Sequence, residues 1–60
     1  MTLAEARKKS GLTQKDVADV LGISDSAVCQ WETGQTFPRI HHLKKLAKLY
    51  RVDISDIISE

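Results

Sequence analysis

The hydrophobic positions of this chain recur at the spacing of an α-helix, most clearly in its second half. One apolar stripe at positions i, i+3, i+4 and i+7 consists of Leu43, Leu46, Ala47 and Tyr50. Lys44, Lys45 and Lys48 lie on the other side, as expected for a helix with one buried and one solvated side. No segment alternates between apolar and polar residues in the manner of a strand. The pattern therefore predicts a helical protein.

Polar capping residues mark the starts of the helices that precede this stripe. Thr2 is followed three residues later by Glu5, and Thr13 by Asp16, which is the spacing of a capping box. Ser24 is a third candidate N-cap, and glycines follow the second and third apolar segments where helices commonly end. We therefore expect a first helix that ends near residue 9, a second helix over about 14–21 and a third over about 25–33.

A short fifth helix is expected near the end of the chain. Asp53 is a candidate N-cap with Asp56 three residues later, and the apolar side would be formed by Ile54, Ile57 and Ile58. There are no internal repeats, low-complexity stretches or interdomain linkers. We expect residues 1–60 to form one all-α domain of five short helices.

Composition restricts the class of protein but does not identify a function. Hydrophobic residues make up 42% and charged residues 28% of the 60 positions, which is typical of a globular protein. No apolar run approaches the roughly 20 residues that cross a bilayer, and the start of the chain lacks the apolar core of a signal peptide. With the single cysteine Cys29, no internal disulfide is possible, so we expect a cytoplasmic protein without a membrane segment. The net charge of +1 favours no particular partner, and the argument for function must rest on arrangement.

The segment from residue 14 to residue 33 has the arrangement of a helix-turn-helix. Its two predicted helices are joined by only a few residues around Gly22, which is too short for anything but a sharp crossing. Ala18 is small enough for the helices to approach closely, and Gly22 can adopt the left-handed backbone of the turn. Ile23 and Val28 are placed to bracket the start of the second of these helices.

The motif TQKDVADVLGISDSAVCQWETG over residues 13–34 resembles the core of the Cro/CI helix-turn-helix family of phage repressors and bacterial regulators. The preceding GL, the following FP with its amphipathic helix, and the closing VDISDII extend the resemblance over nearly the whole chain. The resemblance implies a compact, five-helix, lambda-repressor-like domain that binds double-stranded DNA. It also implies that residues 25–33 form the recognition helix, which enters the major groove.

Four positions of the recognition helix are candidates for contact with base edges because Val28 and Trp31 should point inward. They are Asp25, Ser26, Cys29 and Gln30. Gln30 is the strongest candidate, since a glutamine amide can pair with adenine N6 and N7. Asp25 could accept from cytosine N4 or could stabilise the N-terminus of its own helix. Cys29 could touch a thymine methyl, although a half-buried residue without a role is the favoured interpretation.

Candidates for phosphate contact surround the predicted recognition helix. They are Gln14, Lys15, Ser24, Thr33 and Arg39. By resemblance, Gln14 also braces the recognition helix, and Arg39 stands where the family commonly has a small capping residue. We assign Lys44, Lys45 and Lys48 to the solvated side of the fourth helix instead. The resemblance further implies a partly buried ion pair between Arg7 and Glu32.

Other functions receive little support from the sequence. His41 and His42 are adjacent and would point roughly 100° apart on a helix, so no metal site is expected. No catalytic arrangement or cofactor motif can be assembled, which makes an enzyme the least favoured class. The main alternative is a protein-binding module, such as an antitoxin or tethering domain, which would leave a use for Asp25 and Glu32 near the recognition helix. Because a single helix-turn-helix recognises one half-site, we also consider a weak homodimer on a palindromic operator. Its candidate interface contains Arg51, Ile54 and Ile58, although the two isoleucines could instead complete the core.

Overall fold

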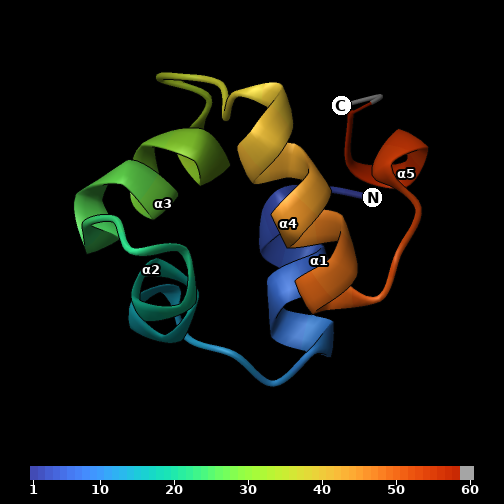
Figure 1. The fold of residues 1–60 in the computed structure, drawn as a ribbon, viewed down its shortest axis with the longest axis horizontal. Coiled ribbons are helices and arrows are strands. Elements are labelled where there is room, and N and C mark those ends of the chain that lie inside the picture. Colours follow the sequence, from blue (N-terminus) through green and yellow to red (C-terminus); the bar gives the residue numbers. More distant parts are fainter. Residues whose placement is uncertain (59–60) are drawn as a thin grey trace.

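The structure is a computed structural model that describes residues 1–58, and the side chain of Ile58 lies outside the described part. Within this range every regular element is a helix (Figure 1). The helices are α1 Leu3–Lys9, α2 Gln14–Leu21, α3 Asp25–Thr33, α4 Ile40–Tyr50 and α5 Ile54–Ile58. The expected all-α class is confirmed, and the bounds expected for the second and third helices agree with α2 and α3.

Side-chain caps explain where the first two helices begin. Thr2 Oγ1 accepts a hydrogen bond of 3.0 Å from the Glu5 amide, and Glu5 Oε1 accepts one of 2.8 Å from the Thr2 amide. Thr13 and Asp16 form the same reciprocal pair at 3.0 and 2.9 Å. Each box satisfies amide groups that a helix leaves without partners in its first turn. Both expected capping boxes are therefore present.

The ends of α4 are less regular than those of α2 and α3. Arg39 occupies the N-cap of α4 without a side-chain cap hydrogen bond, as its replacement of a small capping residue led us to expect. At the other end, Arg51 adopts the left-handed conformation with a φ of 58°. Glycine takes this role after α2 and α3, where Gly22 and Gly34 have φ values of 71° and 82°. The sequence contains no glycine near residue 51 and did not indicate this conformation.

The hydrophobic core joins two groups of helices. In Figure 1, α2 and α3 lie on one side, while α1, α4 and α5 lie on the other. The buried residues between them are Ala6, Val17, Ala18, Leu21, Val28, Leu43, Leu46, Ala47, Tyr50 and Ile57. The predicted stripe of α4 is therefore the buried side of that helix, and α5 closes the core through Ile57. Among the described residues, no helix is long and apolar enough to cross a membrane.

Candidate nucleic-acid interface

The turn between α2 and α3 is fixed by the backbone and by one side chain. Gly22 ends α2 in the left-handed conformation, and the Ile23 amide donates to the Ala18 carbonyl over 3.0 Å. Ser24 then caps α3, since its Oγ accepts a hydrogen bond of 3.2 Å from the Ala27 amide. Ala18 is 1% exposed, which is consistent with close approach of the two helices. Together α2 and α3 form the expected helix-turn-helix.

Helix α3, the expected recognition helix, has a buried side and an exposed polar side. Val28 is 1% exposed and Trp31 is partly buried against the core. The side chains on the opposite side are all exposed, and they are Asp25, Ser26, Cys29, Gln30 and Thr33. The exposure of Cys29 shows that its interpretation as a half-buried residue was wrong, because its position lies outward of Val28. Every candidate for base contact is therefore accessible from solvent.

A hydrogen-bonded cluster of Arg7, Gln14 and Glu32 fixes the C-terminal half of α3. The Arg7 guanidinium donates to both Glu32 carboxylate oxygens, from Nε over 2.7 Å and from Nη2 over 3.2 Å. Gln14 Nε2 donates to Glu32 Oε1 over 2.9 Å. Arg7 Nη1 also donates to the Leu12 carbonyl over 2.9 Å, so α1, α2 and α3 meet at this point. The implied partners Arg7 and Glu32 are thus in direct contact, and Gln14 braces the recognition helix through Glu32.

This cluster is sheltered from solvent, which affects its electrostatics. The side chains of Arg7 and Glu32 are 12% and 7% exposed. Burial alone would raise the pKa of Glu32, but hydrogen bonds from Arg7 and Gln14 outweigh it and the net shift is downward. The hydrogen bond to Glu32 raises the pKa of Arg7. Both groups therefore stay charged at neutral pH, and neither charge is available to a ligand.

The candidates for phosphate contact differ in their exposure to solvent and in their hydrogen-bond partners. Gln14 is partly buried and directs its amide nitrogen to Glu32, whereas Lys15 is exposed and lies 3.6 Å from Asp19 on the same helix. Thr33 is exposed, and its hydroxyl donates to the Gln30 carbonyl over 3.3 Å. Arg39 is exposed just after the loop that follows α3. Gln14 is bonded to α3 through Glu32, which precedes Thr33 in the sequence.

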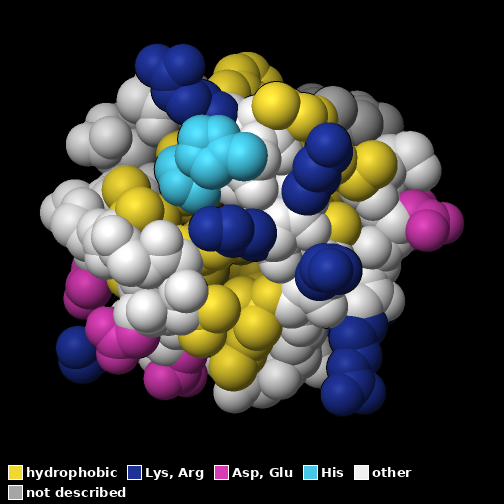
Figure 2. All heavy atoms as spheres, in the orientation of Figure 1, with side chains coloured by type: hydrophobic (Ala, Val, Ile, Leu, Met, Phe, Trp, Pro, Cys, Tyr) yellow, Lys and Arg dark blue, Asp and Glu magenta, His cyan; other side chains and the backbone are white. Residues whose placement is uncertain are grey.

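Charge is distributed unevenly over the visible face of the molecule. Figure 2 shows basic side chains across the part occupied by α4, and acidic ones mainly at the lower left, where Figure 1 places α2, with another at the right edge. The exposed carboxylates of these two helices are Asp16, Asp19 and Asp25, and the exposed lysines of α4 are Lys44, Lys45 and Lys48. The exposed carboxylates of α2 and α3 outnumber their one exposed lysine, Lys15. The exposed charges of α2 and α3 are therefore mainly negative, whereas those of α4 are positive.

Two further features of this region were missed by sequence reasoning. His42 packs against Trp31 at the end of α3 with ring centroids 5.2 Å apart, and His41 lies 4.1 Å from His42. Burial lowers the pKa of His42. The loop between α3 and α4 also leaves Phe37 81% exposed. The sequence identified this segment only as a loop, and an aromatic residue beside proline gave no signal of its exposure.

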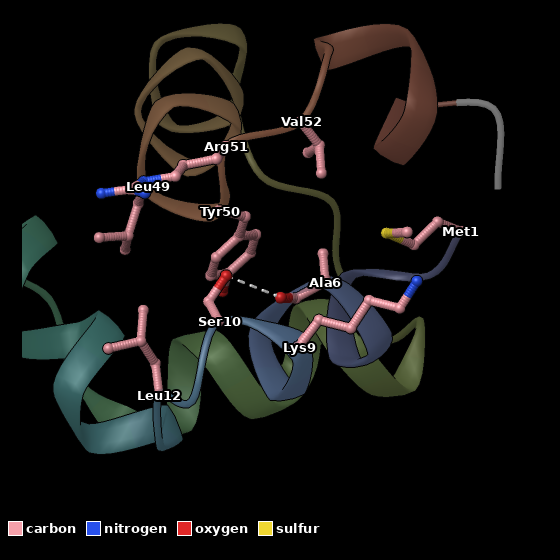
Figure 3. A pocket seen from close by; sticks show the side chains of 9 residues that line it. All are labelled: Met1, Ala6, Lys9, Ser10, Leu12, Leu49, Tyr50, Arg51 and Val52. Atoms are coloured by element: carbon pink, nitrogen blue, oxygen red, sulfur yellow. Dashed lines mark hydrogen bonds between the residues drawn. The ribbon is translucent and has the colours of Figure 1, made fainter.

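One hollow of the described part of the chain lies away from these candidates. It has a volume of about 700 Å³ and is bounded by the C-terminal ends of α1 and α4, with Leu12 and Val52 at its sides (Figure 3). Tyr50 forms part of its wall, and Ser10 Oγ donates to the Ala6 carbonyl within it. None of the candidates for base or phosphate contact lines this hollow. The exposed surface of α3 remains the candidate site.

Comparison with known proteins agrees with this geometry. A family model described as Helix-turn-helix matches residues 3–57. The HTH-type transcriptional activator BcrR of Enterococcus faecalis is 33% identical over 95% of the chain and 28% of its own length. The HTH-type transcriptional regulator PuuR of Escherichia coli K12 is 36% identical over 97% of the chain and 31% of its own length. The cryptic phage CTXphi transcriptional repressor RstR of Vibrio cholerae is 29% identical over 97% of the chain and 52% of its own length.

The chain thus spans between 28% and 52% of the length of these three relatives. A search of solved structures gave no significant match. The family match covers all of α1 to α4 and most of α5, and it includes the turn between α2 and α3. The chain therefore belongs to the helix-turn-helix family of DNA-binding transcription regulators, of the Cro/CI kind.

Proposed function

We propose that this chain is the sequence-specific DNA-binding domain of a prokaryotic or phage transcription regulator, acting in the cytoplasm as a repressor or other regulator. The observation that carries the proposal is the exposed polar side of α3, which is held on its inner side by Val28 and by the Arg7–Glu32 pair. A helix fixed in this way can enter a major groove without first becoming ordered. The proposed activity is binding and not catalysis.

Base contacts are assigned to the exposed side chains in the first two turns of α3. Gln30 pairs with adenine through its amide, and Ser26 donates to or accepts from a neighbouring base edge. Cys29 lies between them in sequence and is placed for the methyl group of thymine. Asp25 accepts from cytosine N4 or stabilises the N-terminus of α3. The exposure of all four side chains supports this assignment.

Phosphate contacts are assigned to residues around α3, in two groups. Gln14 is bonded to Glu32 in the C-terminal half of α3, Thr33 is the last residue of that helix, and Arg39 follows the loop after it. Ser24 and Lys15 supply further contacts from the starts of α3 and α2, where helix amides favour an anion. Lys15 is the weakest of these candidates because Asp19 lies only 3.6 Å from its amine. These contacts set the position of the domain before any base is recognised.

A single helix-turn-helix recognises one half-site, so we further propose that two copies bind a palindromic operator as a weak homodimer. The two half-sites would lie about 34 Å apart, which is one turn of B-DNA. Doubling the contact surface raises specificity beyond what one short helix supplies. This arrangement requires only that both copies face the same side of the duplex.

A protein-binding module remains the second candidate function, and one observation weakens it. Of the two carboxylates that could serve a protein partner beside α3, Glu32 already binds Arg7 and Gln14, which leaves Asp25 exposed. The two candidates differ in their response to salt. DNA binding weakens steeply as salt rises because counterions are released, whereas an apolar protein contact does not.

The decisive experiment selects bound duplexes from a random pool and then measures the mass of the complex. We expect a short consensus sequence and an affinity that falls steeply with salt. A pool that stays random after several rounds, or an affinity independent of salt, would overturn the proposal. The mass of the complex on the selected duplex gives the number of copies bound, and one copy at saturation contradicts the two-copy arrangement.

A further inference from the structure

The outer side of α4 carries a stripe of basic side chains, all of them exposed (Figure 2). They occupy positions i, i+3, i+4 and i+7 of one helical face, and they are His41, Lys44, Lys45 and Lys48. Helix α4 contains no acidic residue. Within residues 1–58 none of its lysines forms an ion pair with a carboxylate, whereas Lys15 of α2 has Asp19 beside it. No described part of the chain therefore neutralises this basic stripe.

The surroundings of the basic stripe offer little to a folded protein partner. A hollow of about 530 Å³ lies along it, and Ala47 is the one residue of its lining with an apolar side chain. Protein interfaces draw most of their affinity from large side chains that are buried in well-packed pockets. A phosphate backbone, by contrast, requires only positive groups along its path. The basic stripe therefore fits a nucleic acid better than a protein.

The length of the basic stripe also suits a nucleic-acid strand. From residue 41 to residue 48 an α-helix rises by roughly 10 Å. Each strand of duplex DNA carries one phosphate per roughly 3.4 Å of its axis, so roughly three phosphates of one strand lie within this length. The three lysines of the stripe match that number.

We propose that the outer side of α4 is a second DNA-binding surface, which holds the phosphate backbone of a further duplex without sequence preference while α3 occupies an operator. In Figure 1, α3 and α4 belong to different groups of helices, so each can present its own surface. One chain then joins two duplexes. The joining of two duplexes rests on the function proposed for α3, whereas binding by α4 requires charge alone.

The two surfaces differ in the charge that a duplex meets. The exposed carboxylates of α2 and α3 repel phosphates, and only correct contacts to the bases offset this repulsion. The basic stripe of α4 attracts a duplex of any sequence. DNA that lacks an operator is therefore expected on α4 and not on α3.

The first test measures binding of the full chain to a duplex without a selected half-site, at several salt concentrations. Lys44→Gln combined with Lys48→Gln should flatten the logarithmic salt slope by about 2, because two fewer phosphates are neutralised. The matched control combines Lys8→Gln with Lys9→Gln, which removes the same charge from exposed positions of α1 and should leave the slope unchanged. Equal flattening by both pairs would reveal an effect of net charge alone. An unchanged slope in the α4 pair would place such DNA elsewhere, and either result overturns the inference.

The second test asks whether one complex holds two duplexes. A duplex with one selected half-site is immobilised and saturated with the chain, unbound chain is washed away, and a labelled duplex without a half-site is added. We expect the wild type and the α1 pair to capture the labelled duplex, and the α4 pair to capture it about tenfold less or worse, since two phosphate contacts are lost. The α4 pair should bind the immobilised half-site within about twofold of the wild type, because its lysines contact the other duplex.

Three outcomes of the second test contradict the inference. The first is no capture by the wild type. The second is a loss of half-site affinity in the α4 pair as large as its loss of capture, because α4 would then lie on the operator duplex itself. The third is displacement of the labelled duplex by a poly-glutamate peptide of equal charge at lower concentration than by unlabelled duplex, which would assign the basic stripe to a protein partner. Failure of the wild type to bind any selected duplex overturns the proposed function instead, and the salt titration then still tests α4.

Discussion

Glu32 accepts hydrogen bonds from Arg7 of α1 and Gln14 of α2 while belonging to α3. Glu32→Ala would leave the sheltered Arg7 guanidinium without its partner, and we expect the free energy of unfolding to fall by about 3 kcal/mol. Chemical denaturation measures this loss. An exposed pair would cost less than about 1 kcal/mol, so a midpoint that barely moves would contradict the structure of the cluster.

The Glu32 carboxylate should also make the free energy of unfolding depend on pH in the acidic range. Because the folded pKa of Glu32 is lowered, its contribution is present above the pKa of the unfolded chain and is lost as pH falls through the folded value. The free energy of unfolding of the wild type should therefore decline toward acid more steeply than that of Glu32→Ala. Parallel declines in the two proteins would show that other carboxylates account for the effect.

The burial of Tyr50 leads us to expect a second pH dependence of stability, at alkaline pH. Burial raises its pKa to about 12 in the folded chain. A raised pKa gives stability that is complete below the unfolded value of about 10 and is lost as pH rises toward 12. Tyr50 is the only tyrosine, so the ultraviolet absorbance of tyrosinate reports its ionisation directly. Tyr50→Phe should remove this part of the alkaline slope, and ionisation of native Tyr50 near pH 10 would contradict its burial.

Gln30 and Arg39 should affect DNA binding in different ways. Gln30→Ala removes a bidentate contact and should cost about 1 to 3 kcal/mol on the preferred site, with loss of preference at one base pair. Arg39→Ala should weaken binding to all sequences alike and reduce the logarithmic salt slope by about 1. Titrations against single-base variants at several salt concentrations separate the two effects. Unchanged base preference in Gln30→Ala would remove Gln30 from the recognition surface.

At the scale of single elements, both ends of α4 lack the usual capping residues, since Arg39 makes no side-chain cap hydrogen bond and Arg51 ends the helix. Arg51 holds the left-handed conformation that suits glycine, with a φ of 58°. Arg51→Gly should stabilise the chain by about 0.5 to 1 kcal/mol, because the backbone strain of a side chain in this conformation disappears. Thermal or chemical unfolding measures the gain.

The opposite substitution at the end of α2 provides the control. Gly22 has a φ of 71° and open space around its missing side chain, so Gly22→Ala tests the backbone conformation alone. We expect it to cost about 1 kcal/mol. If Arg51→Gly were destabilising while Gly22→Ala behaved as expected, then contacts of the Arg51 side chain would outweigh its backbone strain.

The helices themselves were largely predictable because their signals are local. Thr2 and Thr13 each lie three residues before the carboxylate that completes a capping box, and Gly22 follows directly after α2. The left-handed Arg51 was not predictable, since it depends on how the chain must turn to bring Ile57 onto the core. Local sequence specifies a helix end only where the residue present is one that prefers it.

At the scale of the whole molecule, the sequence indicated which side of α3 faces outward but not how the rest of the surface is arranged. Val28 and Trp31 identify the inner side by helical spacing alone. The packing of His42 on Trp31, by contrast, joins residues from α3 and α4 whose proximity no local pattern records. The exposure of Phe37 likewise depends on the path of the loop between these helices. Side-chain contacts between different helices could therefore be inferred only from the family resemblance or from the structure.

The separation between the two sides of α3 has a consequence for how the sequence of such a regulator evolves. The inner side carries Val28 and Glu32, on which folding depends, while the outer side carries residues such as Ser26 and Gln30 that contact no other helix through a hydrogen bond in the described chain. Substitutions of exposed residues usually change the free energy of unfolding by less than about 0.5 kcal/mol. Under the proposed function, substitutions on the outer side can therefore change which operator is recognised while the fold stays stable, so that one scaffold can give rise to regulators of unrelated genes.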